Sequence, residues 1–179
     1  LDPRSDTFDV QSYTINAEFL NYQTQKAIDA TTRISVVLKE SSSKMSLDLL
    51  ELPVSGVLVN GDVVSFSYSS PKLTIDLPAI SVGDTFTVDV SYSGNPSSDA
   101  QWGGFYFTGE YAFNLGVGFA ADPHNFGRAW FPCFDNFVEK STYSFKVKTK
   151  APLRAFCNGL QQSFTLSGDT ATSLFTLNQ

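Results

Sequence analysis

Histidine is nearly absent from this chain: His124 is the only one in 179 residues. A hydrolytic zinc site of the two-histidine, one-glutamate type needs a second imidazole, so this chain alone cannot build one. Methionine occurs once, as Met45, and cysteine occurs twice, as Cys133 and Cys157. The cysteines lack a Cys-x-x-Cys spacing, and they leave open both a disulfide and two free thiols.

Charged residues and long apolar runs are also scarce. Charged side chains make up 17% of the chain, below the roughly 25% typical of globular domains, and the formal net charge is −6. The negative charge argues against nucleic acid and anionic membrane surfaces as partners. No apolar run is long enough for a membrane span. The polar surface must therefore come mainly from uncharged residues, a composition associated with exported β proteins. The sequence has no usable Asn-x-Ser/Thr glycosylation acceptor, which favours a bacterial source. We therefore expect an exported bacterial protein, periplasmic or extracellular.

Strand signals occur from end to end of the chain. Short segments alternate apolar and polar residues, as expected of strands with one solvated face. Asn60-Gly61 between two β-rich flanks predicts a hairpin. No window shows a helical stripe, and Asp135–Thr142 is expected to form at most a short helix or turn. The predicted strands are Tyr13–Phe19, Thr32–Leu38, Met45–Leu49, the hairpin Val57–Phe66, Lys72–Leu77, Thr85–Tyr92, Phe105–Phe107, Tyr143–Lys148, Arg154–Cys157, Gln162–Leu166 and Ala171–Leu177.

This pattern predicts an all-β fold. Many short strands separated by turn residues indicate a saddle-shaped β-sandwich of packed, mostly antiparallel sheets. The length is that of one domain, which we place over residues 1–179. The linker-like stretch Ser93–Ala100 is interpreted as a loop inside this domain.

One dense segment, Arg128-Ala129-Trp130-Phe131-Pro132-Cys133-Phe134-Asp135, stands out from this pattern. A proline within an apolar run cannot lie in a central strand, because it cannot donate to the ladder. Arg128 and Asp135 flank the apolar stretch, and a single buried charge would be costly there. The segment is therefore predicted to be an irregular crossing strand braced by an internal ion pair.

The same segment, with Lys140 five residues after Asp135, resembles the N-terminal domain of the aminopeptidase N-type zinc metallopeptidases, the gluzincin family that includes leukotriene hydrolase. The stretch from Asn114 to Asn136 resembles the branch of this family found in Bacteroidetes-type bacteria. Shorter matches in the same order extend the resemblance over nearly the whole chain: Asp9–Tyr13, Val57–Gly61, Val90–Gly94, Gly104–Tyr106 and Cys157–Gly159.

The resemblance implies the non-catalytic N-terminal part of a longer aminopeptidase, a hydrolase of peptide N-termini. In that family the His-Glu-x-x-His zinc motif, a distant Glu and the Gly-x-Met-Glu-Asn loop lie on a following domain. Zinc is therefore expected in that missing catalytic domain. No cofactor, metal ligand or catalytic residue is expected in this chain. The expected partner is the chain's own downstream catalytic domain, and the expected substrates of the parent are peptides.

A family loop just before the Arg128–Asp135 segment supplies a Gln or Glu that holds the free amine of the substrate. On this sequence the loop falls at Phe119–Asp122, where no Gln or Glu stands. The resemblance thus gives Ala120, Ala121 and Asp122 as substrate-binding candidates, with Asp122 as the only carboxylate. The residues assigned to the structural motif are Arg128, Phe131, Pro132, Cys133, Asp135 and Lys140.

The alternative is a stand-alone extracellular binding module, such as an adhesin or a carbohydrate-binding domain. Its candidate surface is an aromatic cluster that could stack on sugar rings, although packing in a core or between domains is the commoner use of such residues. The cluster comprises Trp102, Phe105, Tyr106, Phe107 and Tyr111.

His124 and Cys133 also allow chemical roles, but simpler ones are expected. His124 has no second metal ligand near it in sequence, so a hydrogen-bonded loop position is predicted. Cys133 has no base other than His124 to activate it, so a buried structural thiol is predicted.

Overall fold

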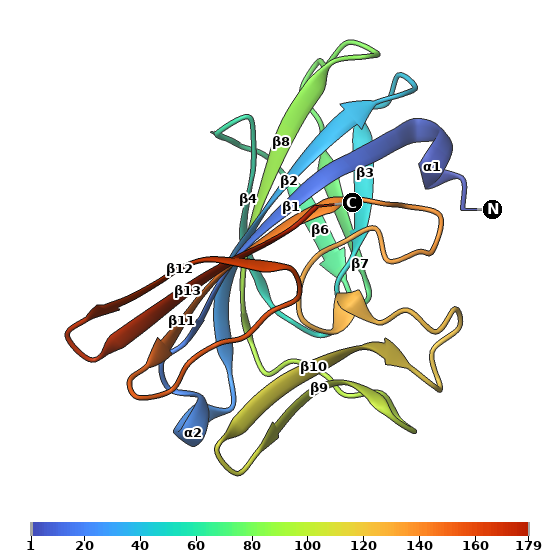
Figure 1. The fold of residues 1–179 in the computed structure, drawn as a ribbon. Helices are drawn as coiled ribbons and strands as arrows, with labels where there is room; N and C mark the ends of the chain where they lie inside the picture. The colour runs from blue at the N-terminus through green and yellow to red at the C-terminus, as the bar shows by residue number, and fades with distance from the viewer. Residues whose placement is uncertain (1, 179) are drawn as a thin grey trace.

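The computed structural model describes residues 2–178 and confirms an all-β protein (Figure 1). The two end residues of the predicted 1–179 domain lie outside the described residues. The strands are β1 (Phe8–Phe19), β2 (Ile28–Leu38), β3 (Lys44–Asp48), β4 (Val54–Val59), β5 (Asp62–Val63), β6 (Phe66–Ser69), β7 (Lys72–Asp76), β8 (Thr85–Gly94), β9 (Gly103–Thr108), β10 (Tyr111–Gly118), β11 (Thr142–Lys150), β12 (Leu160–Ser167) and β13 (Thr170–Leu177). The helical pieces are α1 (Arg4–Thr7), α2 (Tyr22–Gln25) and the 3-10 turn η1 (Gly127–Ala129).

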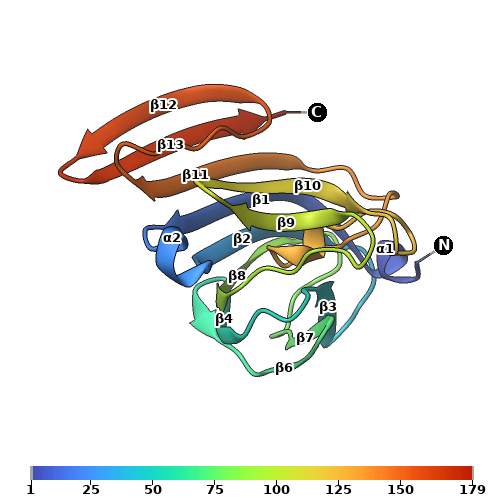
Figure 2. The same cartoon turned by 90° about the horizontal axis from the view of Figure 1, so that it is seen from below.

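The strands form one large sheet and two small ones. The large sheet has eight strands in the order β12-β13-β11-β1-β2-β8-β4-β5. Its pairs are antiparallel except for β1 with β11, which run parallel. The small sheets are the three-stranded β3-β7-β6 and the hairpin β9-β10, and both lie on one side of the large sheet (Figure 2). The prediction of packed, mostly antiparallel sheets is confirmed.

Alternation of side chains decides which face of each strand is buried. In β2 every second residue, from Ile28 to Leu38, is buried, as expected of a sheet with one solvated face. In β1 both Val10 and Tyr13 face the core, although they are three positions apart. A bulge at this point supplies one extra residue, since the register with β2 shifts between Val10 and Ser12.

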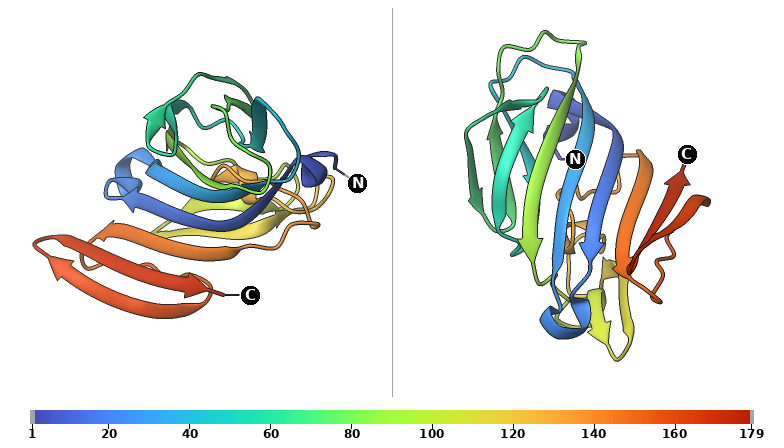
Figure 3. Two further views of the ribbon diagram at one scale, coloured as in Figure 1. Left: turned by 90° about the horizontal axis from the view of Figure 1, so that it is seen from above. Right: turned by 90° about the vertical axis from the view of Figure 1, so that its left-hand side faces the viewer.

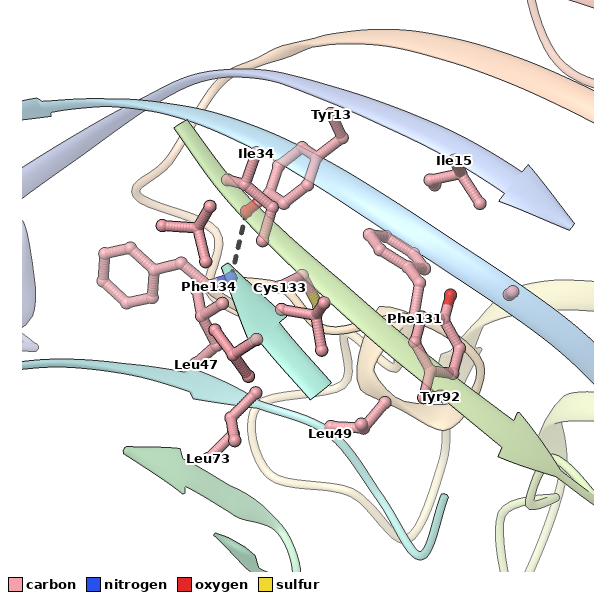
Figure 4. Packing of buried hydrophobic residues seen from close by; sticks show 14 of the residues in the cluster. Tyr13, Ile15, Ile34, Leu47, Leu49, Leu73, Tyr92, Phe131, Cys133 and Phe134 are labelled. Atoms are coloured by element: carbon pink, nitrogen blue, oxygen red, sulfur yellow. Dashed lines mark hydrogen bonds between the residues drawn. The ribbon is translucent and has the colours of Figure 1, made fainter. Parts of the chain in front are cut away.

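The core lies between the large sheet and the small sheets. Ile34 of β2 packs there with Leu47 of β3 and Leu73 of β7, and all three are fully buried (Figure 4). The hairpin β9-β10 covers the C-terminal end of β1, where the ring of Phe105 stacks on that of Phe19 with 5.7 Å between centroids. Strands β12 and β13 form one edge of the large sheet, and the three-stranded sheet lies near the other edge (Figure 3).

The Asn-Gly hairpin is confirmed, but it is shorter than predicted. Asn60 and Gly61 both have positive φ, 51° and 91°, which is the geometry of a two-residue type I′ turn between β4 and β5. The predicted hairpin continued to Phe66. That residue instead begins β6 and pairs with Ile75 of β7 in the three-stranded sheet.

Two other strand predictions need correction. Arg154–Cys157 is not a strand but part of the irregular connection from β11 to β12, where Pro152 has no N–H to give and Phe156 is exposed. Strand β10 was not predicted, because glycines at 116 and 118 weaken the β signal of its second half. Within residues 2–178, no helix has the length and apolar character needed to cross a bilayer.

Candidate functional site

The chain from residue 119 to residue 141 crosses from β10 to β11 without forming a strand, and we call it the crossing segment. It contains a loop at 119–126, the 3-10 turn η1 and then the apolar run that includes Pro132. Cys133 makes an isolated antiparallel bridge with Asp48 at the end of β3. The backbone nitrogen of Asp48 lies 2.7 Å from the carbonyl oxygen of Cys133, and the reciprocal distance is 3.0 Å. The predicted irregular crossing is therefore present, and it is attached to the three-stranded sheet at Cys133.

Arg128 and Asp135 form the predicted ion pair. The Nη1 atom of Arg128 lies 2.6 Å from Oδ2 of Asp135, and the side chains are only 16% and 7% exposed. The Asp135 carboxylate also accepts the backbone N–H groups of Gly127 at 3.1 Å and Arg128 at 3.3 Å. The same guanidinium donates to the carbonyl of Asn125 at 3.0 Å. The pair thus ties η1 to both sides of the crossing segment.

Phe131 and Cys133 of the motif lie in the core among side chains of the sheets (Figure 4). Phe131, Pro132 and Cys133 are all buried. The ring of Phe131 meets Tyr13 edge-on with 5.7 Å between centroids. The backbone N–H of Phe134 donates to the Tyr13 hydroxyl at 3.0 Å, so the polar end of a buried tyrosine is satisfied.

Both cysteines are free, which resolves the disulfide alternative. Burial raises the pKa of the Cys133 thiol well above its usual value, and the nearby carboxylates of Asp135 and Asp48 raise it further. Burial also raises the pKa of the half-buried Cys157 to about 11. A thiol held protonated is a poor nucleophile, in agreement with a structural role for Cys133.

Lys140, the last residue of the motif, is placed differently from the rest. Its side chain is exposed, and it takes part in no ion pair or side-chain hydrogen bond within residues 2–178. The neighbouring Glu139 is the residue that contacts the sheet, accepting the N–H of Val10 at 3.4 Å. Nothing among the described residues shows a structural role for Lys140.

The 119–122 loop lies at the start of the crossing segment. Ala120 and Asp122 are exposed, and Ala121 is half-buried. Their conformation is held by a residue that the sequence did not single out. The carboxylate of Asp99 accepts the backbone N–H of Ala120 at 2.9 Å and that of Ala121 at 3.1 Å.

Asp99 also closes its own turn, accepting the N–H groups of Gln101 at 2.9 Å and Trp102 at 3.0 Å. Partial burial raises the pKa of this carboxyl, but the donated backbone hydrogen bonds outweigh it and lower the pKa to about 2. Asp after Pro-Ser-Ser is a recognisable turn signal, so the local half of this arrangement was open to sequence reasoning. The hydrogen bonds from Ala120 and Ala121 to Asp99 could not be predicted from the sequence.

Two glycines let the β9-β10 hairpin close tightly next to Asp99. Gly103 has φ 121°, and a Cβ there would lie 1.9 Å from the carbonyl oxygen of Val117. A Cβ on Gly118 would lie 2.7 Å from Oδ2 of Asp99. Only glycine fits at these close approaches, so the hairpin and the 119–122 loop form one packed unit.

The predicted aromatic cluster is divided between two faces of the hairpin. Phe105 and Phe107 face inward, where Phe105 packs on Phe19 and Trp130. Tyr111 is 72% exposed at the hairpin turn, and Trp102 is also exposed. Phe113 and Phe119, which the prediction did not include, complete the outer surface: Phe113 stacks on Tyr106 at 5.3 Å, and Phe119 lies 5.0 Å from Trp102. We call Trp102, Tyr106, Tyr111, Phe113 and Phe119 the aromatic face.

His124 is exposed next to this aromatic face, and its Nδ1 atom lies 3.1 Å from the carbonyl oxygen of Gly118. The predicted hydrogen-bonded loop position is thus confirmed. Asn125 beside it is buried, and its side-chain amide has no hydrogen-bond partner within residues 2–178. No three His, Cys, Asp or Glu side chains among the described residues come together as metal ligands.

The amino-terminal residues reach the crossing segment from its other side. Arg4 of α1 lies 2.9 Å from the carboxylate of Asp48, and its guanidinium covers the ring of Phe134 at 4.4 Å. The same Asp48 carboxylate accepts the N–H of Asp135 at 3.1 Å. A continuous polar chain therefore connects α1 to the Arg128–Asp135 pair, and sequence reasoning gave no sign of it.

Comparisons with known proteins agree with this geometry. Residues 10–176 match the family model described as the peptidase M1 N-terminal domain. The M1 zinc metallopeptidase of Deinococcus radiodurans is similar in structure, with a TM-score of 0.84 and 24% identity over 95% of this chain and 39% of that one. A mutant of it bound to a Tyr-Ser-Ala substrate gives a TM-score of 0.82 at the same identity and coverage. The chain thus spans about two fifths of these structures, which show a shared fold. No curated protein matches.

Proposed function

Because this chain belongs to the peptidase M1 N-terminal domain family, we propose that it is the amino-terminal domain of a longer zinc-dependent aminopeptidase. Its role is to pack on a downstream catalytic domain and to form one wall of the substrate cleft. The observation that carries the proposal is the family match over residues 10–176. The solved relative bound to a Tyr-Ser-Ala substrate supports peptides as substrates of the parent.

The zinc of such an enzyme does not fit this chain. The described residues bring no three metal-binding side chains together, and His124 is the single histidine of the sequence. A hydrolytic zinc site needs three protein ligands and a bound water. We therefore assign zinc and hydrolysis to the downstream domain, and to this chain only binding and support.

The aromatic face supports docking of that domain. Contiguous exposed apolar surface on a soluble domain commonly marks a contact with another protein or domain. Here the exposed aromatic rings adjoin the 119–122 loop, through the contact of Phe119 with Trp102 at 5.0 Å. A domain that covers the aromatic face would therefore place the loop at the edge of the interface, where a cleft between the domains would open.

Docking is tested with the downstream catalytic domain of the parent expressed separately. Added to this chain, it should form a complex with aminopeptidase activity. Tyr111→Ser and Phe113→Ser should each weaken the complex by about tenfold or more, because both remove apolar area from the interface. Val63→Ser is the matched control, since Val63 is 85% exposed on β5 at the far edge of the large sheet. Equal effects of all three variants would refute docking through the aromatic face.

Asp122 is proposed as the carboxylate of the loop that faces the substrate amine. A carboxylate favours a cationic amine when the two lie within about 4–6 Å. In the parent, Asp122→Asn should raise KM for free-amine peptides more than for N-blocked ones. Identical changes for both substrate types would show that Asp122 faces away from the cleft.

The alternative of a stand-alone sugar-binding module has less support. Residues 10–176 match the peptidase M1 N-terminal domain model, and two of the five aromatic residues predicted for sugar stacking, Phe105 and Phe107, pack inward. We retain the expectation of an exported bacterial parent as a proposal, because its support is the low share of charged residues. Fractionation of the source cells would test it.

A further inference from the structure

The chain has two Asn-Gly pairs, Asn60-Gly61 and Asn158-Gly159, and their surroundings in the fold differ. An asparagine side chain can reach the backbone N–H groups that neighbour it in sequence. A glycine in the next position leaves its nitrogen open to such an approach, because glycine has no Cβ. Both pairs therefore carry the same local chemistry, and the fold decides which of them can react.

Asn60 is held against β8 by two hydrogen bonds. Its backbone N–H donates to the carbonyl oxygen of Thr87 at 2.9 Å, and its Oδ1 atom accepts the N–H of Thr87 at the same distance. Asn60 and Gly61 also form the tight turn between the paired residues Val59 and Asp62. The Asn60 side chain is therefore directed at β8, and it can reach the nitrogen of Gly61 only when this contact opens locally.

Asn158 has no such restraint among the described residues. It lies exposed in the irregular connection from β11 to β12, and the following Gly159 is also exposed. Neither the side chain nor the backbone N–H of Asn158 makes a hydrogen bond within residues 2–178, and the backbone N–H of Gly159 makes none there either. The side-chain amide and the next backbone nitrogen are therefore open to solvent and to each other.

We propose that Asn158 is a site of spontaneous deamidation, a covalent modification that needs only water and its hydroxide. Hydroxide removes the proton of the Gly159 backbone N–H, and this nitrogen attacks Cγ of Asn158. The new N–C bond closes a succinimide ring, while the Cγ–Nδ2 bond breaks and Nδ2 leaves as ammonia. Water then opens the ring at either carbonyl, which leaves aspartate or isoaspartate. The net change is amide plus water to carboxylate plus ammonium.

The modification falls where the outer hairpin β12-β13 begins. A Cβ built on Gly159 would lie 2.1 Å from the carbonyl oxygen of Thr176, so the backbone has no spare room at this point. Isoaspartate carries the main chain through its own Cβ and lengthens it by one carbon directly before Gly159. The pairing of Leu160 with Thr176 must then shift. Only β13 pairs with β12 among the described residues, so this edge strand should loosen.

The first experiment follows the 179-residue chain during incubation at mildly alkaline pH, where hydroxide drives the first step. Peptide mass spectrometry measures the conversion of each asparagine to the acid, in the native chain and in urea. In the native chain Asn158 should react faster than Asn60 by about tenfold or more, because the hydrogen bonds of Asn60 to Thr87 must open first. In urea the two rates should become similar, since both then depend on the shared Asn-Gly sequence.

Two variants complete the comparison. Asn158→Gln should abolish the modification at this position, because the longer side chain would have to close a larger ring, which forms more slowly. Asn60→Gln should leave the rate at Asn158 unchanged. Equal native rates at Asn60 and Asn158 would overturn the proposal. An Asn158 that is stable in the native chain but reacts in urea would overturn it as well.

Hydrogen exchange measures the effect on the outer hairpin. In the incubated chain enriched in isoaspartate, the β12 amides that bond to β13 should exchange faster by about tenfold or more than in Asn158→Gln incubated in the same way. The amides of β2, inside the large sheet, should exchange equally in both samples. If isoaspartate forms and the β12 amides stay protected, the loosening of the hairpin is refuted and the modification site stands.

Discussion

Removing the carboxylate of Asp135 should destabilise the fold more than any surface charge would. The carboxylate lies 2.6 Å from Nη1 of Arg128 and accepts two backbone N–H groups of η1. Without it, the guanidinium and both N–H groups lose their acceptor inside the protein. Breaking a buried pair by removing one partner costs about 3–5 kcal/mol. We expect the lower end, about 3 kcal/mol, because Arg128 keeps its bond to the Asn125 carbonyl.

The assay is urea and thermal unfolding of the 179-residue chain, followed by tryptophan fluorescence. For a domain of this size, about 3 kcal/mol should lower the melting temperature by roughly 6–12 °C. Asp76→Ala is the matched control, because Asp76 pairs with Lys44 at 3.3 Å while the side chains are 48% and 64% exposed. That change should cost less than about 1 kcal/mol.

A double substitution separates the charge from the packing. Replacing both Arg128 and Asp135 with apolar residues of similar size removes the stranded charge, so it should destabilise less than Asp135→Ala alone. The reasoning would be refuted if Asp135→Ala lowered stability no more than Asp76→Ala. In that case the ion pair would contribute no more than a surface feature.

Three further predictions concern a glycine, the two cysteines and the zinc content of the chain. Gly103→Ala should destabilise by more than about 3 kcal/mol, because its Cβ would meet the Val117 carbonyl; Gly56→Ala, with open space around it, should stay within about 0.5 kcal/mol in unfolding assays. A thiol reagent such as Ellman's should leave Cys133 unmodified in the native chain and react slowly with Cys157, whereas both should react quickly in urea. The chain should hold no stoichiometric zinc after dialysis and cleave no aminoacyl substrate; elemental analysis showing one chelatable zinc per chain, with hydrolysis, would contradict this.

Much of the fold followed from the sequence because alternation and turn chemistry are local. The Asn60-Gly61 turn and the alternating β2 were readable from a few neighbouring residues. The failures have equally local causes. Arg154–Cys157 follows Pro152 and pairs with no strand among the described residues. Strand β10 carries Gly118, which the close approach to Asp99 requires.

The site was predictable only in part, because most of it depends on contacts between distant residues. The charges of Arg128 and Asp135 flank one apolar run, so their pairing could be argued from the sequence. The connection from Asp99 to Ala120 spans 21 residues, and the one from Asp48 to Asp135 spans 87. No periodicity or turn signal specifies such pairs.

The parallel pairing of β1 with β11 also sets the order in which this chain can fold during synthesis. Ser12 lies beside Thr142, so one edge of the amino-terminal strand waits for a partner encoded 130 residues later. At ribosomal speeds of about 5–20 residues per second, that wait is on the order of ten seconds. During it, β1 and β2 can pair, but the edge of β1 presents unpaired N–H and C=O groups and a row of apolar side chains. Chaperone capture of the nascent chain should therefore peak before residue 142 emerges and fall after it.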